Sequence, residues 1–312
     1  MRYLVTGGAG FIGSHLAERL VRDGHTVRVL DDLSSGRLEN LAAVRGQSEF
    51  IEGDIRDRAV VRRAVSGVEY VIHEAARRSV PKSMKDPCTY TEVNVLGTVN
   101  LLEEARAAKV KRVVLASSSS IYGETDRLPF REDQPVVPIS PYAMSKLHGE
   151  QTCQLFARSF GLETVVLRYF NVFGPRQSLE NEYAVVVPKF ITCLLRRESP
   201  PVHGDGFQSR DFTFIENVTA ATIRASTAPG ISGEVFNIAC GKSHSVLELL
   251  GELNRLLNLS IPPTFTPPRP GDVRKTLADI SKAMHHLDWQ PTVGFVEGLT
   301  QTVAWFKNGL PT

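Results

Sequence analysis

Tyr142 and Lys146 are the two residues whose spacing points most directly to chemistry. They lie four positions apart, and Ser140 and Pro141 just before them suit a helix cap and a first helical turn. On a helix the two side chains share a face. A free tyrosine has a pKa of about 10, and bringing it near neutrality takes about 4 kcal/mol. Nearby positive charge can supply this stabilisation, so the pair predicts a tyrosine base.

A run of serines, 117–120, follows the apolar stretch 113–116. The stretch is expected to be a buried strand, and open α/β sheets bind ligands where their strands end. A serine hydroxyl at that edge can hydrogen-bond the same substrate oxygen as Tyr142 and pass on its proton.

Three glycines near the start of the chain are expected to position a second ligand. Gly7, Gly10 and Gly13 are spaced G-x-x-G-x-x-G between a strand pattern at 3–5 and a helical pattern. The first suits a tight turn, the second lets a pyrophosphate approach the backbone, and the third lets helix and strand pack closely. The pattern predicts a dinucleotide on the helix N-terminus.

Asp31 extends that prediction. It ends a strand expected over 26–30 and lies 18 residues past Gly13, where a carboxylate can accept hydrogen bonds from both adenosine ribose hydroxyls. A carboxylate there repels a 2′-phosphate, which favours NAD, whereas Arg37 nearby leaves NADP open.

Strands and helices alternate through the first half, and the strands are apolar on both faces. This predicts an α/β fold: a Rossmann-type doubly wound parallel sheet with a smaller, interleaved C-terminal substrate domain. We expect an NAD-binding domain over 1–169, to which about 211–240 returns, and a mainly substrate-binding domain over 170–312. Further strands are expected at 50–51, 70–73, 164–169, 235–238 and 264–266, helices at 60–65, 89–108, 184–195, 216–225, 246–257 and 295–306, and an extended proline-rich stretch at 261–270.

Composition narrows the class of protein. The 312 residues are 42% hydrophobic, and 36 Lys and Arg nearly cancel 34 Asp and Glu, which does not favour a nucleic-acid partner. The strand-like start and the lack of long apolar runs predict neither a signal peptide nor a membrane span. The four cysteines are scattered without metal-ligand spacing, so we expect a cytoplasmic protein without a metal.

Together these motifs resemble the extended short-chain dehydrogenase/reductase family, and within it the NAD-dependent nucleotide-sugar 4-epimerases that act on UDP-galactose and UDP-N-acetylhexosamines. The resemblance rests on the glycines, Asp31, Asp54-Ile55, the serine run through Gly123, Tyr142 with Lys146, and the stretch 168–175. It spans nearly the whole chain, through 210–212 and 269–272.

The resemblance implies a role for each matching residue. Ser118, Tyr142 and Lys146 would be catalytic, with Lys146 lowering the pKa of Tyr142 and binding the nicotinamide ribose. The expected NAD-binding residues are Gly7, Gly10, Phe11, Ile12, Gly13, Asp31, Asp32, Ser35, Gly36, Asp54, Ile55, Ala75, Ala76, Arg77, Asn94, Tyr142, Lys146 and Tyr169. The expected UDP-sugar-binding residues are Ser118, Ser119, Ser120, Tyr142, Asn171, Val187, His203, Arg210, Arg269, Asp272 and Thr276.

It also implies a reaction. Tyr142 would take the proton of the C4 hydroxyl while C4 gives a hydride to bound NAD, and the resulting 4-keto sugar would turn over and be reduced on its other face. NAD would then stay bound throughout. Relatives usually dimerise through two helices per subunit, here 89–108 and 142–160, so a homodimer is expected.

Sister enzymes of this family share the fold. The 4,6-dehydratases carry Asp-Glu, and decarboxylating relatives usually a glutamate, where this chain has Ser119-Ser120, which argues against both. UDP-glucuronate 4-epimerases generally have Thr in place of Asn171, so a carboxylated sugar is a less favoured alternative. A dehydrogenase with net turnover of NAD(P) is another alternative, and a regulatory protein is disfavoured by the intact catalytic set.

Thr276 matches a position whose bulk limits the room beside the sugar. A small residue there is associated with N-acetylated substrates, so we expect activity on UDP-glucose, UDP-galactose and their N-acetyl counterparts. Arg77-Arg78 is a departure from relatives, which often have small or apolar residues there. The two charges can bind phosphate or an acidic sugar, or face solvent.

Overall fold

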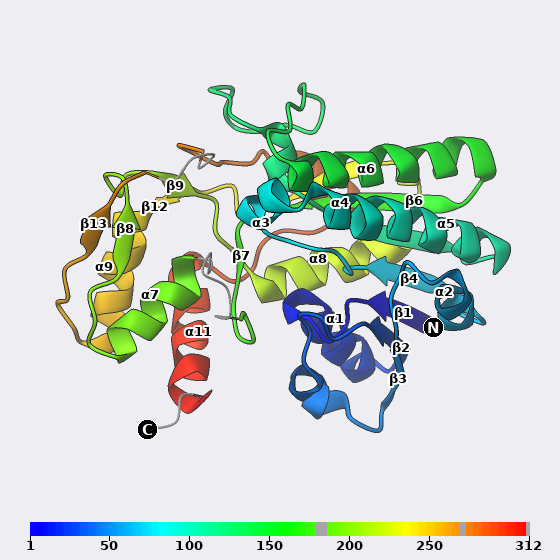
Figure 1. Cartoon of the computed structure of the whole chain (residues 1–312), viewed down its shortest axis with the longest axis horizontal. Helices are drawn as coiled ribbons and strands as arrows, with labels where there is room; N and C mark the ends of the chain where they lie inside the picture. Colours follow the sequence, from blue (N-terminus) through cyan, green and yellow to red (C-terminus); the bar gives the residue numbers. More distant parts are fainter. Residues whose placement is uncertain (179–185, 269–272, 310–312) are drawn as a thin grey trace.

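A seven-stranded parallel sheet forms the centre of the larger part of the molecule, in the order β11-β6-β5-β4-β1-β2-β3 (Figure 1). The computed structural model describes residues 1–178, 186–268 and 273–309. The chain order reverses between β1 and β4, and the crevice at such a switch point is where open α/β sheets bind ligands. The strands are β1 Arg2–Thr6, β2 Thr26–Asp31, β3 Ser48–Glu52, β4 Tyr70–His73, β5 Arg112–Ser118, β6 Glu163–Tyr169 and β11 Val235–Ile238.

Helices cover both faces of this sheet, as predicted for a doubly wound fold. One layer holds α2 Arg58–Val65, α5 Gly97–Ala107 and α6 Pro141–Phe160, and the other holds α1 Phe11–Arg22 and α8 Ile215–Thr227 (Figure 1). Except for the edge strand β3, the strands between them are almost fully buried, because both of their faces meet apolar helix surfaces. Shorter segments complete this part: η1 Leu38–Val44, α3 Val80–Lys85, α4 Pro87–Tyr90, the π-helical η2 Thr91–Leu96, η3 Ser119–Tyr122 and α10 Ser281–His286.

A smaller unit packs beside the carboxyl ends of the strands. Its own apolar core joins three helices, and its short strands pair in two-stranded sheets, of which β13-β8 lies far from the larger part (Figure 1). The chain returns from it to the main sheet, where α8 covers one face and β11 pairs with β6. The elements are α7 Val186–Leu195, α9 Val246–Leu257, α11 Phe295–Gly309, β7 Val172–Phe173, β8 Pro201–His203, β9 Ser209–Arg210, β10 Thr213–Phe214, β12 His244–Ser245 and β13 Thr264–Thr266.

The expected helix at 89–108 differs in detail from the structure. The chain follows one helical path there, but it passes through the π-helical segment η2 between α4 and α5. The end of the serine run and the two residues after it form the short helix η3, Ser119–Tyr122, which periodicity over so few residues could not reveal.

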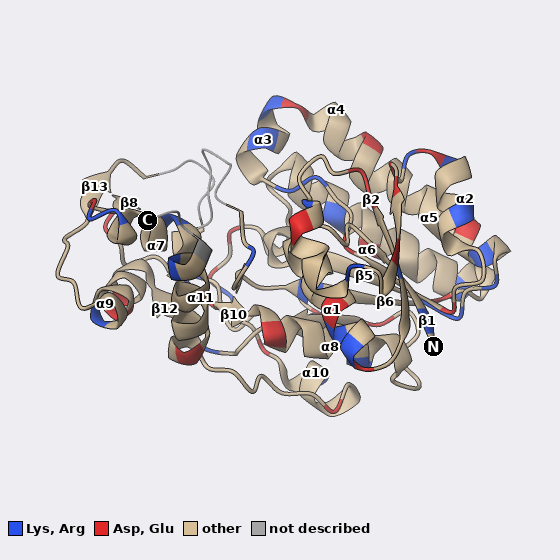
Figure 2. Cartoon of the chain, turned by 90° about the horizontal axis from the view of Figure 1, so that it is seen from below, with Lys and Arg blue, Asp and Glu red and all other residues tan. Residues whose placement is uncertain are grey.

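Acidic and basic residues are interspersed along the outer helices (Figure 2). This matches the near balance of 36 basic and 34 acidic residues. Among the described residues, no helix is both long and apolar enough to cross a bilayer.

Candidate active site

The loop from β1 to α1 forms a cradle that only glycine can build. Gly7 has φ +67°, and a Cβ there would lie 2.7 Å from the backbone nitrogen of Ala75. A Cβ on Gly13 would lie 2.2 Å from the carbonyl oxygen of Gly7. Gly10 caps α1 without a side-chain hydrogen bond to the helix, so the first N–H groups of α1 are available to an anion. This cradle fits the pyrophosphate of a dinucleotide.

Asp31 ends β2 beside this cradle. One carboxylate oxygen accepts from the Ala9 N–H and the other from the Leu33 N–H, both at 2.9 Å. Burial raises the pKa of Asp31, and these two backbone hydrogen bonds oppose that rise. The carboxylate is therefore held in one orientation at the floor of the cleft, where ribose hydroxyls can reach its remaining lone pairs.

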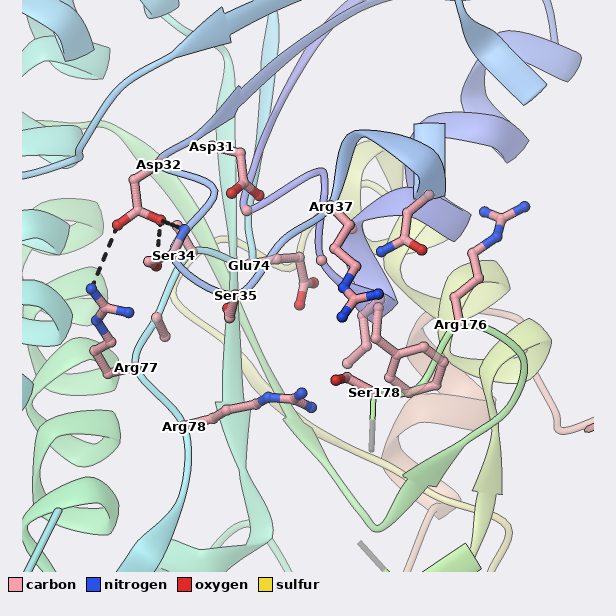
Figure 3. A pocket seen from close by; sticks show the side chains of 18 of the residues that line it. Asp31, Asp32, Ser34, Ser35, Arg37, Glu74, Arg77, Arg78, Arg176 and Ser178 are labelled. Atoms are coloured by element: carbon pink, nitrogen blue, oxygen red, sulfur yellow. Dashed lines mark hydrogen bonds and ion pairs between the residues drawn. The ribbon is translucent and has the colours of Figure 1, made fainter. Parts of the chain in front are cut away.

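A cleft of about 430 Å³ opens over the cradle and the ends of β1, β2 and β4. Figure 3 shows Glu74, Arg37 and Arg78 projecting into it, together with Asp31. The guanidinium of Arg176 turns away from the centre of the cleft and pairs with Glu18 of α1. Of the residues predicted to bind NAD, the cleft is lined by Gly7, Gly10, Phe11, Ile12, Gly13, Asp31, Asp32, Ser35, Asp54, Ile55, Ala75, Ala76 and Arg77.

Three other predicted NAD-binding residues do not line this cleft but contact residues that do. Gly36 packs against Asp31, since a Cβ on Gly36 would lie 2.7 Å from Asp31 Oδ1. Asn94 accepts from the Arg77 N–H at 2.7 Å and donates to the Arg77 carbonyl at 3.0 Å. The Tyr169 hydroxyl donates to Glu74.

The sequence interpretation missed several residues of this cleft. Glu74 was detectable in principle, because a charged residue directly after an apolar strand reaches the ligand-binding edge of the sheet. Gln177, Trp305 and Phe306 come from remote segments and carried no comparable signal. Gln177 lines both this cleft and its neighbour, and its buried Oε1 has no hydrogen-bond partner among the described residues.

The three expected catalytic residues come from two neighbouring elements. Ser140 caps α6 by accepting from the Ala143 N–H at 3.2 Å, which sets Tyr142 in the first turn and Lys146 one turn later. Ser118 ends β5 and hydrogen-bonds the Tyr142 side chain. Lys146 Nζ donates to the Ala116 carbonyl of β5 at 2.8 Å. The structure thus brings Ser118, Tyr142 and Lys146 together.

The charges around Tyr142 include one that the sequence analysis did not assign to it. Burial raises the pKa of Tyr142, while the Ser118 hydrogen bond and the positive charge of Arg78 lower it. Lys146 is directed to β5 instead, and burial lowers its own pKa to about 8 against the opposing charges of Glu74 and Glu150. Arg78, one of the two arginines whose role the sequence left open, therefore adds positive charge close to Tyr142.

A second cleft of about 440 Å³ adjoins the first, and the two share Phe11, Ile12, Arg78, Gln177 and Ser178. It lies over the serine run and the first turn of α6. The Ser120 hydroxyl in it is buried without a hydrogen-bond partner among the described residues. The residues predicted to bind the sugar nucleotide that line it are Ser118, Ser119, Ser120, Tyr142, Asn171, Arg210 and Thr276.

Of the four other predicted substrate contacts, the two that the structure describes lie outside the second cleft. Val187 lies in the apolar core of the smaller unit and is fully buried. His203 Nδ1 shares a 2.7 Å hydrogen bond with the Thr266 hydroxyl and lines neither cleft. Periodicity could not show that Val187 packs inward, because the surrounding helix is apolar on several sides. Arg269 and Asp272 lie outside the described residues.

The family model of the NAD dependent epimerase/dehydratase family matches residues 3–239, which contain the glycine cradle and all three catalytic candidates. The chain belongs to this family. The family cofactor is NAD, and the glycine cradle and Asp31 fit it.

Known members of the epimerase/dehydratase family resemble this chain over almost its full length. The UDP-glucose 4-epimerase of Mycolicibacterium smegmatis is 42% identical over 312 residues, covering 99% of each chain. The structure of a UDP-N-acetylglucosamine 4-epimerase from Methanobrevibacter ruminantium, in complex with UDP-N-acetylmuramic acid, superposes with a TM-score of 0.95 at 38% identity, covering 99% of each chain. A Thermus thermophilus UDP-glucose 4-epimerase complexed with NAD has a TM-score of 0.91 at 38% identity, covering 99% of this chain and 100% of the other.

Proposed function

We propose that this protein inverts C4 of a UDP-hexose, interconverting UDP-glucose with UDP-galactose and UDP-GlcNAc with UDP-GalNAc. The observation that carries the proposal is the position of Tyr142. Its phenol is hydrogen-bonded to Ser118 in a cleft continuous with the one that fits NAD. A base in that position can act on a sugar hydroxyl beside the cofactor.

Each catalytic residue then has one task. NAD, when bound, supplies a reversible acceptor for the hydrogen of C4. Tyr142 takes the proton of the C4 hydroxyl, with Ser118 hydrogen-bonded to the same oxygen. Arg78 favours the phenolate by its charge. Lys146, anchored to β5, would hold a hydroxyl of the nicotinamide ribose, as the family resemblance implies. After the 4-keto sugar turns, Tyr142 returns the proton to the oxygen of the inverted centre.

The second cleft offers groups suited to a sugar diphosphate. The planar guanidinium of Arg210 can bind phosphate oxygens in bidentate fashion. Asn171 adds an amide close to the same cleft. We assign Arg269 and Asp272 to the nucleotide on the sequence resemblance alone.

The serine pair beside Ser118 favours epimerisation over dehydration. Ser119 and Ser120 line the cleft, and neither can serve as the carboxylic acid and carboxylate that elimination of water requires. Thr276 is small and buried at its edge, which is consistent with room for an N-acetyl group. The similarity to the UDP-N-acetylglucosamine 4-epimerase of Methanobrevibacter ruminantium supports the same assignment.

We also propose that the protein is a homodimer in which α5 and α6 meet their counterparts. Exposed apolar side chains on α6 and at the end of η2, just before α5, support this arrangement: Leu96, Met144, Leu155 and Phe160 are all 44% exposed or more. Such residues gain most from a partner surface.

The deciding experiment incubates purified protein with UDP-glucose, UDP-GlcNAc or UDP-glucuronate, without added NAD, and separates the products. C4 inversion of the first two supports the proposal. Inversion of UDP-glucuronate alone would replace it with the uronate epimerase. An oxidised product that requires stoichiometric NAD would indicate a dehydrogenase.

A further inference from the structure

A chain of two hydrogen bonds links the backbone of Asp211 to the side chain of Asn171 through the hydroxyl of Thr276. The Asp211 N–H donates to Thr276 Oγ1 at 3.1 Å, and this hydroxyl donates to Asn171 Oδ1, also at 3.1 Å. Asp211 and Thr276 are 0% and 5% exposed, so water competes little for these groups. The hydroxyl therefore acts as a relay between a fixed donor and a cleft residue.

The first donor is rigidly held. The Asp211 carboxylate accepts from the backbone N–H groups of Cys240 at 2.9 Å, Gly241 at 3.0 Å and Ala278 at 3.3 Å. The Thr276 N–H in turn donates to the Ser209 carbonyl at 3.0 Å. Both partners of the first hydrogen bond are thus fixed through their own backbones.

The direction of the chain determines which end of the Asn171 amide meets Thr276. The Thr276 hydroxyl has one proton, and its oxygen already accepts from Asp211. If the amide were turned over, Asn171 Nδ2 would donate to Thr276, and the hydroxyl proton would be buried without this acceptor. Because an unsatisfied buried donor is costly, the arrangement with Oδ1 toward Thr276 is favoured.

The opposite end of the amide is left for a ligand. Asn171 lines the second cleft, and its Nδ2 has no hydrogen-bond acceptor among the described residues. The backbone of Asn171 is also constrained, with φ +28° and its carbonyl accepting from the Thr213 N–H at 3.2 Å. A donor fixed in this way suits an oxygen of a phosphate or a sugar.

We propose that Thr276 is a positioning residue whose hydroxyl orients the Asn171 amide so that Nδ2 donates to the bound UDP-sugar. This inference rests on the proposed function for the identity of the ligand. Thr276 then has two roles. The small volume of its side chain admits the sugar, and its hydroxyl determines which end of the Asn171 amide faces the ligand.

Thr276→Val separates these two roles, because valine keeps the volume and loses the hydroxyl. We expect the dissociation constants of UDP-glucose and UDP-GlcNAc, measured by calorimetry on the NAD-loaded protein, to rise alike by about tenfold, the usual loss for one neutral hydrogen bond. Thr276→Ser keeps the hydroxyl and should restore most of the affinity. Thermal melting of all variants shows whether the fold is intact.

Asn171→Ala tests whether the effect of Thr276→Val acts through the Asn171 amide. In that background Thr276→Val should weaken binding by less than twofold, since no amide remains to be oriented. Wild-type affinity in Thr276→Val, or an equal loss with and without Asn171, would overturn the inference. Wild-type protein that binds UDP-sugars but does not epimerise them would overturn the proposed function alone.

Discussion

The Tyr169 hydroxyl donates a 2.8 Å hydrogen bond to Glu74 Oε1 inside the NAD cleft. Tyr169 also shares a 2.8 Å hydrogen bond with the Thr222 hydroxyl of α8. The hydrogen bond between Tyr169 and Glu74 links the end of β6 to the end of β4, and these two strands lie on opposite sides of β5. An acidic group is therefore fixed directly before Ala75 and Ala76, which the resemblance assigns to NAD binding.

Glu74→Gln should change how stability depends on pH. Burial raises the pKa of Glu74 to about 7, against opposing effects from Tyr169 and Lys146, from an ordinary value of 4.5. A raised carboxyl pKa means that the folded state holds the proton more tightly, so stability is fully present below pH 4.5 and is lost as pH rises to about 7. The melting temperature of the wild type relative to Glu74→Gln should fall across that window and then level off. If the melting temperatures of the two proteins changed with pH in parallel, Glu74 would not have a raised pKa in the folded state.

Tyr142→Phe should abolish most of the epimerase activity while the fold is retained. Removing a general base typically costs a factor of about 10²–10⁴ in rate. The matched control is Tyr70→Phe, because Tyr70 begins β4 at the opposite end of the sheet and stacks on Tyr3. Product formation from UDP-glucose measures both variants. Activity of Tyr142→Phe within tenfold of the control would remove Tyr142 as the base.

Gly13→Ala should empty the NAD cleft. The added methyl would lie 2.2 Å from the Gly7 carbonyl oxygen, so the cradle must distort, at a cost of about 1–3 kcal/mol. Gly251→Ala in α9 is the control, since its methyl would meet nothing within 4 Å. The wild type and the control should carry NAD(H) through gel filtration, and Gly13→Ala should not. A wild type that emerges without NAD(H) would refute the resident cofactor.

Replacing Arg168 by Met should destabilise the sheet beneath the serine run. Arg168 and Glu150 form a buried ion pair at 2.9 Å, with side chains 6% and 3% exposed. Removing one partner of such a pair typically costs about 3–5 kcal/mol. Arg255→Ala breaks the exposed pair with Glu252 and should cost less than about 1 kcal/mol. Urea unfolding measures the free energy of unfolding of both variants. Similar decreases would show that the buried ion pair stabilises the protein no more than the exposed one.

Thr276→Tyr should lower kcat/KM more for UDP-GlcNAc than for UDP-glucose. The larger ring would occupy the edge of the second cleft where Thr276 now lies. Any loss that arises from misorienting Asn171 applies to both sugars and cancels in the ratio of the two kcat/KM values. An unchanged ratio would count against Thr276 as a limit on substrate size.

Local patterns in the sequence were enough to predict the main sheet and the shared helix of Tyr142 and Lys146. The strands predicted at 235–238 and 264–266 and the helix predicted at 246–257 coincide with β11, β13 and α9. The relation of Tyr142 to Lys146 follows from helix geometry alone once the cap at Ser140 is recognised. Such features depend on residues within a few positions of one another.

Only the tertiary structure decided which remote residues meet. Tyr169 and Glu74 are 95 positions apart, and Thr276 and Asn171 are 105 apart. Neither pair has a periodic signal, because each contact depends on how the segments pack across the sheet and between the two parts of the molecule. The same packing buries Val187 in the core and directs Lys146 to the carbonyl of β5. The sequence alone determined the fold and the reactive groups, whereas packing determined their partners, charges and orientation.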